Sequence, residues 1–580
     1  MKTDLILLHA PSVYDFREKS ILYGPMSDLV PSSPIFEMYP IGFLTISNYL
    51  EKRGISVRII NIAYLMMTDN KFNVEELIKK LNPIAFGIDL HWLPHCQGSI
   101  EIAKLVKKYH PNTPVIFGGF SSSFFYEELI QFEQVDFILR GDSTEEPLYQ
   151  LVKILKGLTN TSQKSTEIFN EIPNLVWKKN KKVYVNPIKC ISSNLDEIDF
   201  DYTIMFKQVF RYKSIRSIIP FNGWFNYPVT TIPIIRGCNK NCSGCGGSNV
   251  AFKIFGEREK PAFRDPKKLV DEILKIQKYI DAPVFILGDI TQGGQDYLKE
   301  FFKNAKRLKR DIQIFFEFFD PPSKWFYDEI KKVFDNVCYE ISPDSHDEAI
   351  RRKMGKSFTN KELLESIKYA LKNGAKRYDL YFMTGLPTQT KNSILDTVEF
   401  CKDFYNEINW DKRFMPFISP MAPFLDPGSR AFLNPEEFGY ILTAKTLKDH
   451  IKAITSPSWK YILNYESKYI TRDELVDSTY EAAIGLNRLK GKAGAISLDV
   501  MNNNEERIKK ALEILKEIDK ILLIKDETLR ENELKKLKDK TFEYSLSTVC
   551  EKSELEFPLS NKSFHWFSII KFLLFSKKIK

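Results

Sequence analysis

The sequence predicts an α/β protein made of a doubly wound, flavodoxin-like N-terminal domain, a partial (β/α)6 barrel and a helical C-terminal region. Three observations support this fold class. Apolar, strand-like runs alternate with helical runs twice, first in residues 1–155 and again in residues 226–421. Residues 422–580 have mostly helical periodicity. A chain of 580 residues is too long for one core, and residues 156–225 are expected to connect the two α/β parts.

In the first part, five apolar runs are separated by helical segments. The runs are Leu5–Leu8, Val57–Ile62, Ile84–Ile88, Val115–Phe117 and Phe137–Leu139. Strands joined through helices pair in parallel, and such sheets bind ligands at the carboxyl ends of their strands. No G-x-G-x-x-G follows the first run, which argues against a dinucleotide. Turns containing glycine follow the last two runs instead, and they let a backbone approach a ligand closely; they are Gly118-Gly119 and Gly141-Asp142.

Three cysteines with the spacing C-x3-C-x2-C follow the apolar run Thr230–Ile235; they are Cys238, Cys242 and Cys245. Three thiolates on one short loop can hold three irons of a [4Fe–4S] cube and leave the fourth iron open. A structural zinc site would need four protein ligands, and no other Cys or His lies nearby in the sequence. The other five cysteines are scattered singly, so we expect neither a disulfide framework nor a second cluster.

The third part repeats the strand-then-helix pattern. Its strand-like runs after Thr230–Ile235 include Val284–Leu287, Ile312–Phe318, Val337–Ile341 and Lys376–Thr384. A helix over Pro266–Ile280 begins with Asp265 as its N-cap and proline in its first turn. Six such units make a partial barrel, and barrel enzymes carry their chemistry at the carboxyl ends of the strands.

The cysteine spacing resembles the signature of the radical S-adenosylmethionine (SAM) superfamily, whose members bind SAM at the open iron of the cluster. The N-terminal turns resemble those of the cobalamin-binding domain that precedes many radical SAM domains; the matching segments are Pro40–Gly54, Val115–Gly119 and Val135–Leu148. The resemblance implies three cofactors, namely one [4Fe–4S] cluster, SAM and cobalamin. It also implies that cobalamin lies against Gly118, Gly119, Gly141 and Asp142.

The D-x-H-x-x-G motif that places a histidine below cobalt in other cobalamin-binding domains is absent after the first strand. Asp89-Leu-His91 mimics its beginning, but it follows the third strand, which is the wrong turn. A lone histidine in a loop is more often structural than a metal ligand. We therefore expect neither His91 nor His9 to bind cobalt.

The resemblance further assigns residues to SAM at strand ends that follow Cys245 in the order typical of the family. These residues are Gly288, Asp289, Glu340, Ser342, Arg352 and Gly385. Gly288-Asp289 takes the place of the usual Gly-Gly-Glu that holds the SAM amino group, and Gly385 begins the turn expected near adenine. The residue before the third cysteine is usually aromatic and packs on SAM, but in this chain it is Gly244. No catalytic side chain is identified.

The resemblance implies that an electron entering the cluster cleaves SAM to methionine and a 5′-deoxyadenosyl radical, which removes hydrogen from an unactivated carbon. The overall plan resembles an archaeal-type group of cobalamin-domain radical SAM proteins, some of which join carbons of tetraether membrane lipids into cyclopentane rings. We therefore expect C–C bond formation in such a lipid. Two alternatives stay open: a cobalamin-dependent C-methyltransferase acting on a small molecule or peptide, and a non-catalytic cobalamin or redox sensor.

Composition and charge restrict the partners. The net charge of +9 comes from lysines spread along helical faces, which predicts a solvated surface and no nucleic-acid partner. No targeting segment precedes the first strand and no apolar run could span a bilayer, so we expect a cytoplasmic protein that takes electrons from a ferredoxin- or flavodoxin-type reductant.

The apolar segment Phe564–Phe575 is followed by Lys577, Lys578 and Lys580. This pattern suits a helix lying on the inner face of the membrane, and docking onto a neighbouring domain is the alternative.

Overall fold

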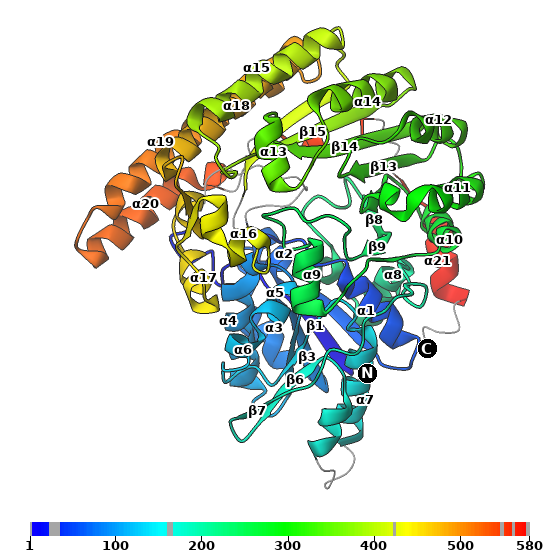
Figure 1. Ribbon diagram of the computed structural model, residues 1–580. Helices are drawn as coiled ribbons and strands as arrows, with labels where there is room; N and C mark the ends of the chain where they lie inside the picture. Colours follow the sequence, from blue (N-terminus) through cyan, green and yellow to red (C-terminus); the bar gives the residue numbers. More distant parts are fainter. Residues whose placement is uncertain are drawn as a thin grey trace.

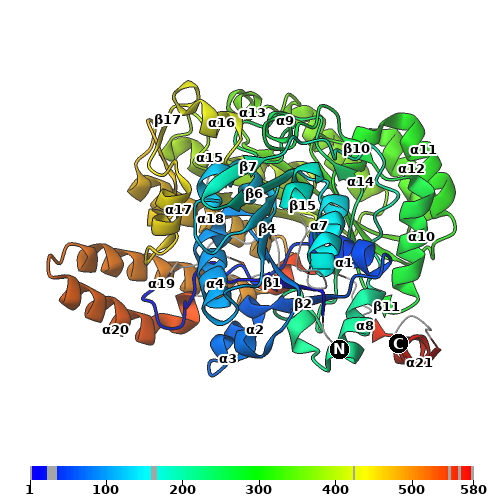
Figure 2. The ribbon, with the colours of Figure 1, turned by 90° about the horizontal axis from the view of Figure 1, so that it is seen from below.

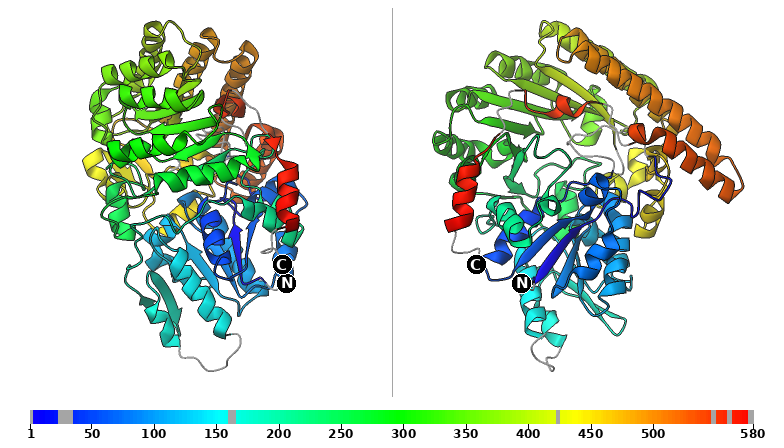
Figure 3. Two further views of the ribbon diagram at one scale, coloured as in Figure 1. Left: turned by 90° about the vertical axis from the view of Figure 1, so that its right-hand side faces the viewer. Right: turned by 180° about the vertical axis from the view of Figure 1, so that it is seen from behind.

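The computed structural model describes residues 3–22, 35–158, 166–421, 425–545, 550–558 and 563–575. Two large sheets, each flanked by helices, lie one above the other, with the N-terminal sheet in the lower half of Figure 1 and the second sheet above it. The C-terminal helices run along one side of the upper half, as the views in Figure 3 show. The α/β fold class predicted from the sequence is confirmed.

The N-terminal sheet has seven strands in the order β2-β1-β3-β4-β5-β6-β7. The first five pair in parallel, and their order is that of flavodoxin-like doubly wound folds. The remaining two form an antiparallel hairpin that extends the sheet from within the predicted connector. The strands are β1 (Leu5–His9), β2 (Val57–Asn61), β3 (Ala85–Asp89), β4 (Val115–Gly118), β5 (Phe137–Leu139), β6 (Leu175–Lys179) and β7 (Lys182–Val185).

Helices cover this sheet, so strands such as β1 and β3 are buried along their whole length and consist largely of apolar residues. The helices of this part are α1 (Gly42–Glu51), α2 (Ile62–Thr68), α3 (Val74–Lys80), α4 (Cys96–Tyr109), α5 (Phe120–Phe124), α6 (Tyr126–Leu129) and α7 (Glu145–Leu158), followed in the connector by α8 (Thr203–Tyr212).

The second sheet has six strands, all parallel, in the order β16-β15-β14-β13-β12-β8. Its two end strands do not pair with each other, so the barrel is partial, as predicted. The strands are β8 (Thr230–Pro233), β12 (Val284–Leu287), β13 (Gln313–Phe318), β14 (Asn336–Asp344), β15 (Arg377–Thr384) and β16 (Phe414–Pro420). The helices between them are α9 (Asn249–Gly256), α10 (Pro266–Gln277), α11 (Gly294–Ala305), α12 (Lys324–Val333), α13 (Glu348–Met354), α14 (Asn360–Lys372) and α15 (Lys391–Glu407).

The C-terminal region is mainly helical. Helix α18 (Arg472–Lys492) packs against α15 and β16, and α19 (Leu498–Leu522) packs on α18. Helix α20 (Glu527–Ser545) pairs with α19, and the two project from the body of the molecule (Figure 2). The smaller elements are α16 (Arg430–Leu433), α17 (Leu447–Ala453), β17 (Tyr440–Leu442) and β18 (Tyr465–Ser467).

The last helix, α21 (Trp566–Phe575), is attached to the barrel side of the molecule. Strand β19 (Ser563–Phe564) pairs with β11 (Ile280–Asp281), and α21 packs against α8 with Ile569 buried. Phe572 and Leu573 are partly buried against the body of the molecule, and its other apolar side chains, Phe567 among them, are exposed. The three lysines expected to follow it lie outside the described residues. Within the described part of the chain, no helix combines the length and the apolar character that a membrane crossing requires.

Candidate functional site

The three cysteines lie on the loop between β9 (Ile235–Arg236) and α9, and all three are free thiols. The backbone N–H of Lys240 donates to Sγ of Cys238 at 3.3 Å, and the N–H of Gly247 donates to Sγ of Cys245 at 3.2 Å. Hydrogen bonds from backbone amides to sulfur are a means by which proteins stabilise and tune cluster-bound cysteines. The loop therefore presents its sulfurs in a form that fits an iron–sulfur cluster.

The same sulfurs do not fit a single metal ion. With Zn–S bonds of about 2.3 Å, three sulfurs on one tetrahedral zinc lie about 3.8 Å apart. In the described ranges, the only three His, Cys, Asp or Glu side chains whose ligand atoms lie within 4.8 Å of one another are three histidines of the first domain. The three cysteine sulfurs do not form such a close group, so they are not arranged around a single ion.

Elements distant in the sequence hold the cluster loop in place. The N–H of Ser243 donates to the carbonyl oxygen of Met354 at 2.9 Å, and the N–H of Gly246 donates to Oδ2 of Asp426 at 3.0 Å. Gly355 ends α13 with φ +98°, and a Cβ there would lie 2.8 Å from the carbonyl oxygen of Asn241. The absence of a side chain at Gly355 thus lets the end of α13 pack directly against the backbone of the cysteine loop.

The structure explains the unusual Gly244. A Cβ at this position would lie 2.8 Å from Sδ of Met421 and 3.7 Å from Cε of Met354. Methionine side chains therefore occupy the space beside Gly244, which an aromatic side chain would otherwise enter. Because methionine is flexible and apolar, it can form a similar surface from another part of the chain.

The strand end at Gly288-Asp289 lies next to the cluster loop. The carboxylate of Asp289 is buried and accepts hydrogen bonds from the N–H groups of Thr291 (2.8 Å) and Phe319 (2.9 Å), so the protein itself satisfies it. Gln292 is the side chain that reaches the loop: its Oε1 accepts from the N–H of Asn239 at 2.8 Å. Its Nε2 is buried and has no partner among the described residues. This unpaired donor beside Cys238 fits a polar cofactor such as SAM.

The second group of predicted SAM residues follows β14. Glu340 is half-buried in the barrel, and its loss of solvent raises its pKa well above the ordinary value. Arg352 is exposed on α13, 3.7 Å from Glu348. The cation beside the cluster loop is instead Lys356, whose Nζ lies 2.8 Å from Asp344 and donates to the carbonyl oxygen of Ser342. Burial raises the pKa of Cys242, and Lys356 opposes this.

Tyrosines of the C-terminal region cover the turn at Gly385. Its φ is +84°, and its carbonyl oxygen accepts a hydrogen bond from the hydroxyl of Tyr440 at 2.7 Å. A Cβ at Gly385 would lie 2.3 Å from the hydroxyl oxygen of Tyr465. The glycine is thus required by the approach of Tyr465. No sequence pattern predicted that these tyrosines lie against the barrel.

A cavity of about 340 Å³ lies at the carboxyl ends of the N-terminal strands. All four residues predicted to contact cobalamin line it, namely Gly118, Gly119, Gly141 and Asp142. Gly118 is open to the cavity, since a Cβ there would have no atom within 4 Å. At Gly119, where φ is +115°, a Cβ would lie 2.4 Å from Cα of His91, so this glycine instead allows two loops to approach each other.

Two ion pairs join the cavity wall to the barrel side of the molecule. Glu145 pairs with Arg236, two residues before the first cluster cysteine (Oε2 to Nη1, 3.1 Å). Asp142 pairs with Arg258 (Oδ1 to Nη2, 3.0 Å). The Asp142 carboxylate is therefore already neutralised by the protein. Because Arg236 also lines the cavity, the cavity and the cluster loop are adjacent.

Glu317, at the end of β13, titrates near neutral pH. Burial raises its pKa to about 7, although it accepts a hydrogen bond from the N–H of Gly288. A carboxyl whose pKa is raised by folding stabilises the protein fully below its unfolded pKa near 4.5, and this stabilisation is lost as the pH rises through about 7. We expect Glu317→Gln to be more stable than the unmodified protein at pH 8 and to lose part of the pH dependence. Thermal unfolding of both proteins at pH 5 and pH 8 tests this, and equal shifts at both pH values would contradict it.

Comparison with known proteins agrees with this geometry. Residues 232–401 match the radical SAM superfamily, and residues 32–148 match the B12 binding domain. The anaerobic magnesium-protoporphyrin IX monomethyl ester cyclase of Rubrivivax gelatinosus is 23% identical over 386 residues, which are 65% of this chain and 63% of that protein. The chain thus spans less than two thirds of that relative.

Two solved structures share the fold. The radical S-adenosylmethionine methyltransferase TsrM from Kitasatospora setae, with cobalamin and a [4Fe-4S] cluster bound, gives a TM-score of 0.57 at 13% identity, over 88% of this chain and 100% of that one. The apo form of the cobalamin-dependent S-adenosylmethionine radical enzyme OxsB gives 0.54 at 13% identity, over 94% of this chain and 84% of that one.

The two domain matches correspond to the two halves of the site described above. The B12-binding match includes the cavity glycines, and the radical SAM match includes the three cysteines. The cofactors of this domain pair are a [4Fe–4S] cluster, SAM and cobalamin. The chain thus carries a radical SAM domain and a B12-binding domain, the combination that cobalamin-dependent radical SAM enzymes have.

Proposed function

We propose that this chain modifies an unactivated carbon atom, using SAM and cobalamin at one active site between its two α/β domains. The supporting observation is the position of Arg236, which lines the cavity of the first domain and lies two residues before Cys238. A cofactor in the cavity and a cluster on the loop would therefore border the same space. When bound, the reduced cluster and SAM supply the radical chemistry that removes hydrogen from carbon.

The side chains around the loop have defined tasks in this proposal. The unpaired Nε2 of Gln292 and the ammonium group of Lys356 bind polar groups of SAM, for which charge-assisted hydrogen bonds are well suited. Tyr440 and Tyr465 close the barrel over Gly385 and exclude water from reactive species. The ion pairs of Arg236 and Arg258 fix the loop against the cavity. An external reductant of ferredoxin or flavodoxin type delivers the electron.

The reaction that we favour joins two carbons of a membrane lipid, with ring formation in a tetraether lipid as the specific case. The support for a lipid substrate is helix α21, which is docked through Ile569 and exposes most of its other apolar side chains. A short apolar helix followed in the sequence by lysines suits an anionic membrane surface.

We expect the double variant Phe567→Ser, Leu574→Ser to lose most of the binding to vesicles of anionic phospholipid. Both side chains are exposed, so the substitutions remove membrane contact without opening the core. Leu523→Ser is the matched control, because Leu523 and Phe567 are each 81% exposed but lie on different elements. Flotation assays measure the bound fraction. Equal binding by both variants would remove the support for a membrane surface.

Methyl transfer to carbon is the second candidate. It is favoured by the cavity at the strand ends, because cobalamin can carry a methyl group and both domains border this cavity. The structural likeness to TsrM establishes only a common fold, and does not choose between the two reactions.

Anaerobic incubation with methyl-labelled SAM, a strong reductant and extracts of lipids and small molecules tests the proposal. We expect formation of 5′-deoxyadenosine and a product without label that has lost two hydrogens, as carbon–carbon joining requires. Label in the product would instead establish methyl transfer. If a protein loaded with cluster and cobalamin forms neither product nor deoxyadenosine, a sensor explains the chain better than an enzyme.

A further inference from the structure

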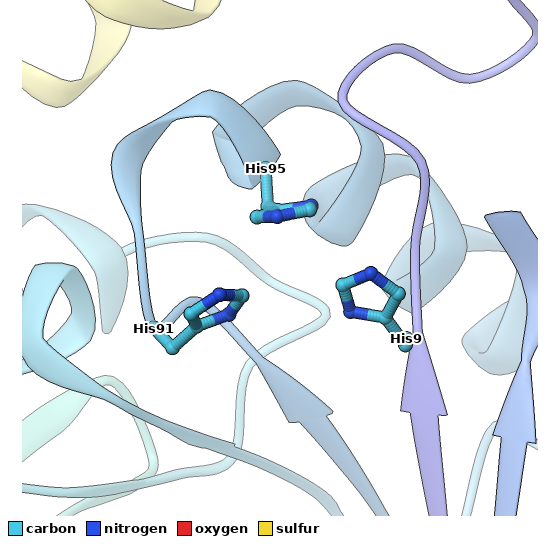
Figure 4. A group of neighbouring side chains, drawn as sticks. All are labelled: His9, His91 and His95. Atoms are coloured by element: carbon cyan, nitrogen blue, oxygen red, sulfur yellow. The ribbon is translucent and has the colours of Figure 1, made fainter. Parts of the chain in front are cut away.

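Three histidines of the first domain converge at the carboxyl edge of the N-terminal sheet. His9 ends β1, His91 follows β3, and His95 lies in the short helix η1 (Leu93–His95) that precedes α4. One ring nitrogen of each lies within 4.8 Å of the others, and Figure 4 shows the three rings arranged around a common space. His91 is therefore not the lone loop histidine that the sequence suggested.

Each ring is held in place through its Nδ1 atom. Nδ1 of His9 lies 3.1 Å from both carboxylate oxygens of Asp89, and Nδ1 of His91 lies 2.6 Å from Oδ2 of the same residue. Nδ1 of His95 lies 3.1 Å from the carbonyl oxygen of Ala10. Because these oxygens only accept hydrogen bonds, Nδ1 carries a proton in all three rings, and in neutral His91 and His95 the lone pair is on Nε2. Nε2 of His9 donates to the carbonyl oxygen of Phe36, so His9 binds a metal only when the ion takes the place of that proton. Metal-binding histidines are typically oriented in this way.

The space between the rings suits one ion. Ring centroids are separated by 4.7 Å (His9 to His95), 4.9 Å (His91 to His95) and 6.0 Å (His9 to His91). Three imidazoles on a tetrahedral zinc, with Zn–N bonds of about 2.0 Å, have centroids about 5 Å apart. Nε2 of His91 and of His95 has no hydrogen-bond partner within the described ranges. The carbonyl oxygen of Phe36 lies 3.0 Å from Nε2 of His9 and borders the same space.

From this geometry we propose that His9, His91 and His95 bind one divalent transition-metal ion of the zinc class through their Nε2 atoms. Imidazole nitrogen is a preferred ligand for zinc and its neighbours in the first transition row, and three protein ligands leave one position open. Asp89 is a positioning residue, since it holds two of the three rings by their other nitrogen.

The cobalt of cobalamin does not explain the same arrangement. The corrin ring occupies four positions around cobalt, so a protein can add one histidine from below. Such a contact could use His91, which borders the cavity, but it would leave Nε2 of His95 facing the other two rings without a partner. Burying a polar atom without a partner is costly, and His95 is buried.

The proposed ion would stiffen a loop that contacts the catalytic side of the molecule. Trp92 lies between two of the ligands in sequence, and its Nε1–H donates to Oδ1 of Asp426 at 3.4 Å. The other oxygen of Asp426 accepts from Gly246 in the cluster loop. A metal that ties His91 and His95 to the end of β1 thereby fixes the position of Trp92 and its contact with the cluster loop.

Metal analysis of the full chain tests the proposal. The protein is produced with a histidine-free affinity tag, reconstituted with zinc and desalted, and zinc, iron and cobalt are counted per chain. We expect about one zinc per chain, as for a built three-histidine site, and the same amount in a variant with all three cluster cysteines replaced by alanine. The double variant His91→Ala, His95→Ala is expected to lose it. The control His110→Ala should keep it, because His110 lies in the same domain but binds the carbonyl oxygen of Ile78.

A measurement on the unaltered chain guards against misfolding of the double variant. Removal of the metal by a chelator should lower the melting temperature, and added zinc should restore it, since an ion that binds only the folded state stabilises that state. Three outcomes would overturn the proposal. They are a reconstituted chain without zinc, retention of zinc in the double variant, and a nitrogen splitting in the cob(II)alamin resonance spectrum that disappears in His91→Ala.

Discussion

Replacing Cys242 with alanine is expected to remove the iron–sulfur cluster and all turnover of SAM. Bound iron should fall from about four atoms per chain to almost none, since the cube then retains only two protein ligands. We expect no compensation by the neighbouring sulfurs, because in the proposed cluster site Cys238 and Cys245 would each bind one iron already. Iron content, the absorbance of the reconstituted protein and the formation of 5′-deoxyadenosine measure the effect.

Cys190→Ala provides the matched control. Cys190 is a half-buried free thiol in the connector, and only its backbone takes part in the hydrogen bonds around Asn174. This variant should retain both iron and turnover. If Cys242→Ala keeps its full complement of iron, the assignment of the loop as the cluster site is wrong, and the proposed function is wrong with it.

Replacing Arg258 with methionine is expected to have the largest effect on stability. Arg258 and Asp142 are each only 3% exposed, and Arg258 also donates to Oγ of Ser143 (3.2 Å) and to the carbonyl oxygen of Ser192 (2.9 Å). Removing one partner of a buried ion pair leaves an uncompensated charge and costs about 3–5 kcal/mol. We expect a loss of this size in the free energy of unfolding, measured by urea denaturation of the cofactor-free chain.

Two further variants show whether burial of the pair is the cause. The double variant Asp142→Asn, Arg258→Met removes the unpaired charge and should recover part of the stability. Arg310→Met breaks the exposed pair with Asp335 and should change stability little, because solvent screens such pairs. If Arg258→Met and Arg310→Met lowered the free energy of unfolding by similar amounts, burial of the Arg258–Asp142 pair would not be the cause of the loss.

Local sequence patterns predicted the architecture well, because each strand and helix is specified by its own residues. The alternation of apolar runs predicted the five parallel strands of the first sheet and five of the six strands of the partial barrel, with β16 missed. The spacing of Cys238, Cys242 and Cys245 predicts the cluster loop. Both signals depend on neighbours within a few residues. The folded chain brings the predicted glycines at 118, 119 and 141 to one cavity, although their contact with cobalamin stays a prediction.

The parts of the site that depend on distant contacts could not be predicted in this way. Asp426 holds Gly246 from 180 positions away in the sequence, and Met421 fills the space beside Gly244. His9 pairs with Asp89 across 80 positions, which is why the three histidines looked unrelated. The sequence offered several cations after β14 for a carboxylate of SAM, and the fold of α13 shows that Lys356, not Arg352, is the one beside the loop.

The supports of the cysteine loop also constrain how the protein is made. The loop leaves the ribosome long before Asp426 and Ala431, which later bind the backbone of Gly246 and Ser243. Because synthesis runs from the N-terminus, a nascent chain exposes three unsupported thiols throughout translation of the barrel. We therefore expect iron loading to be a late step in maturation, and we expect a truncated polypeptide ending before Asp426 to carry all three cysteines but to lack the contacts that hold their loop in place.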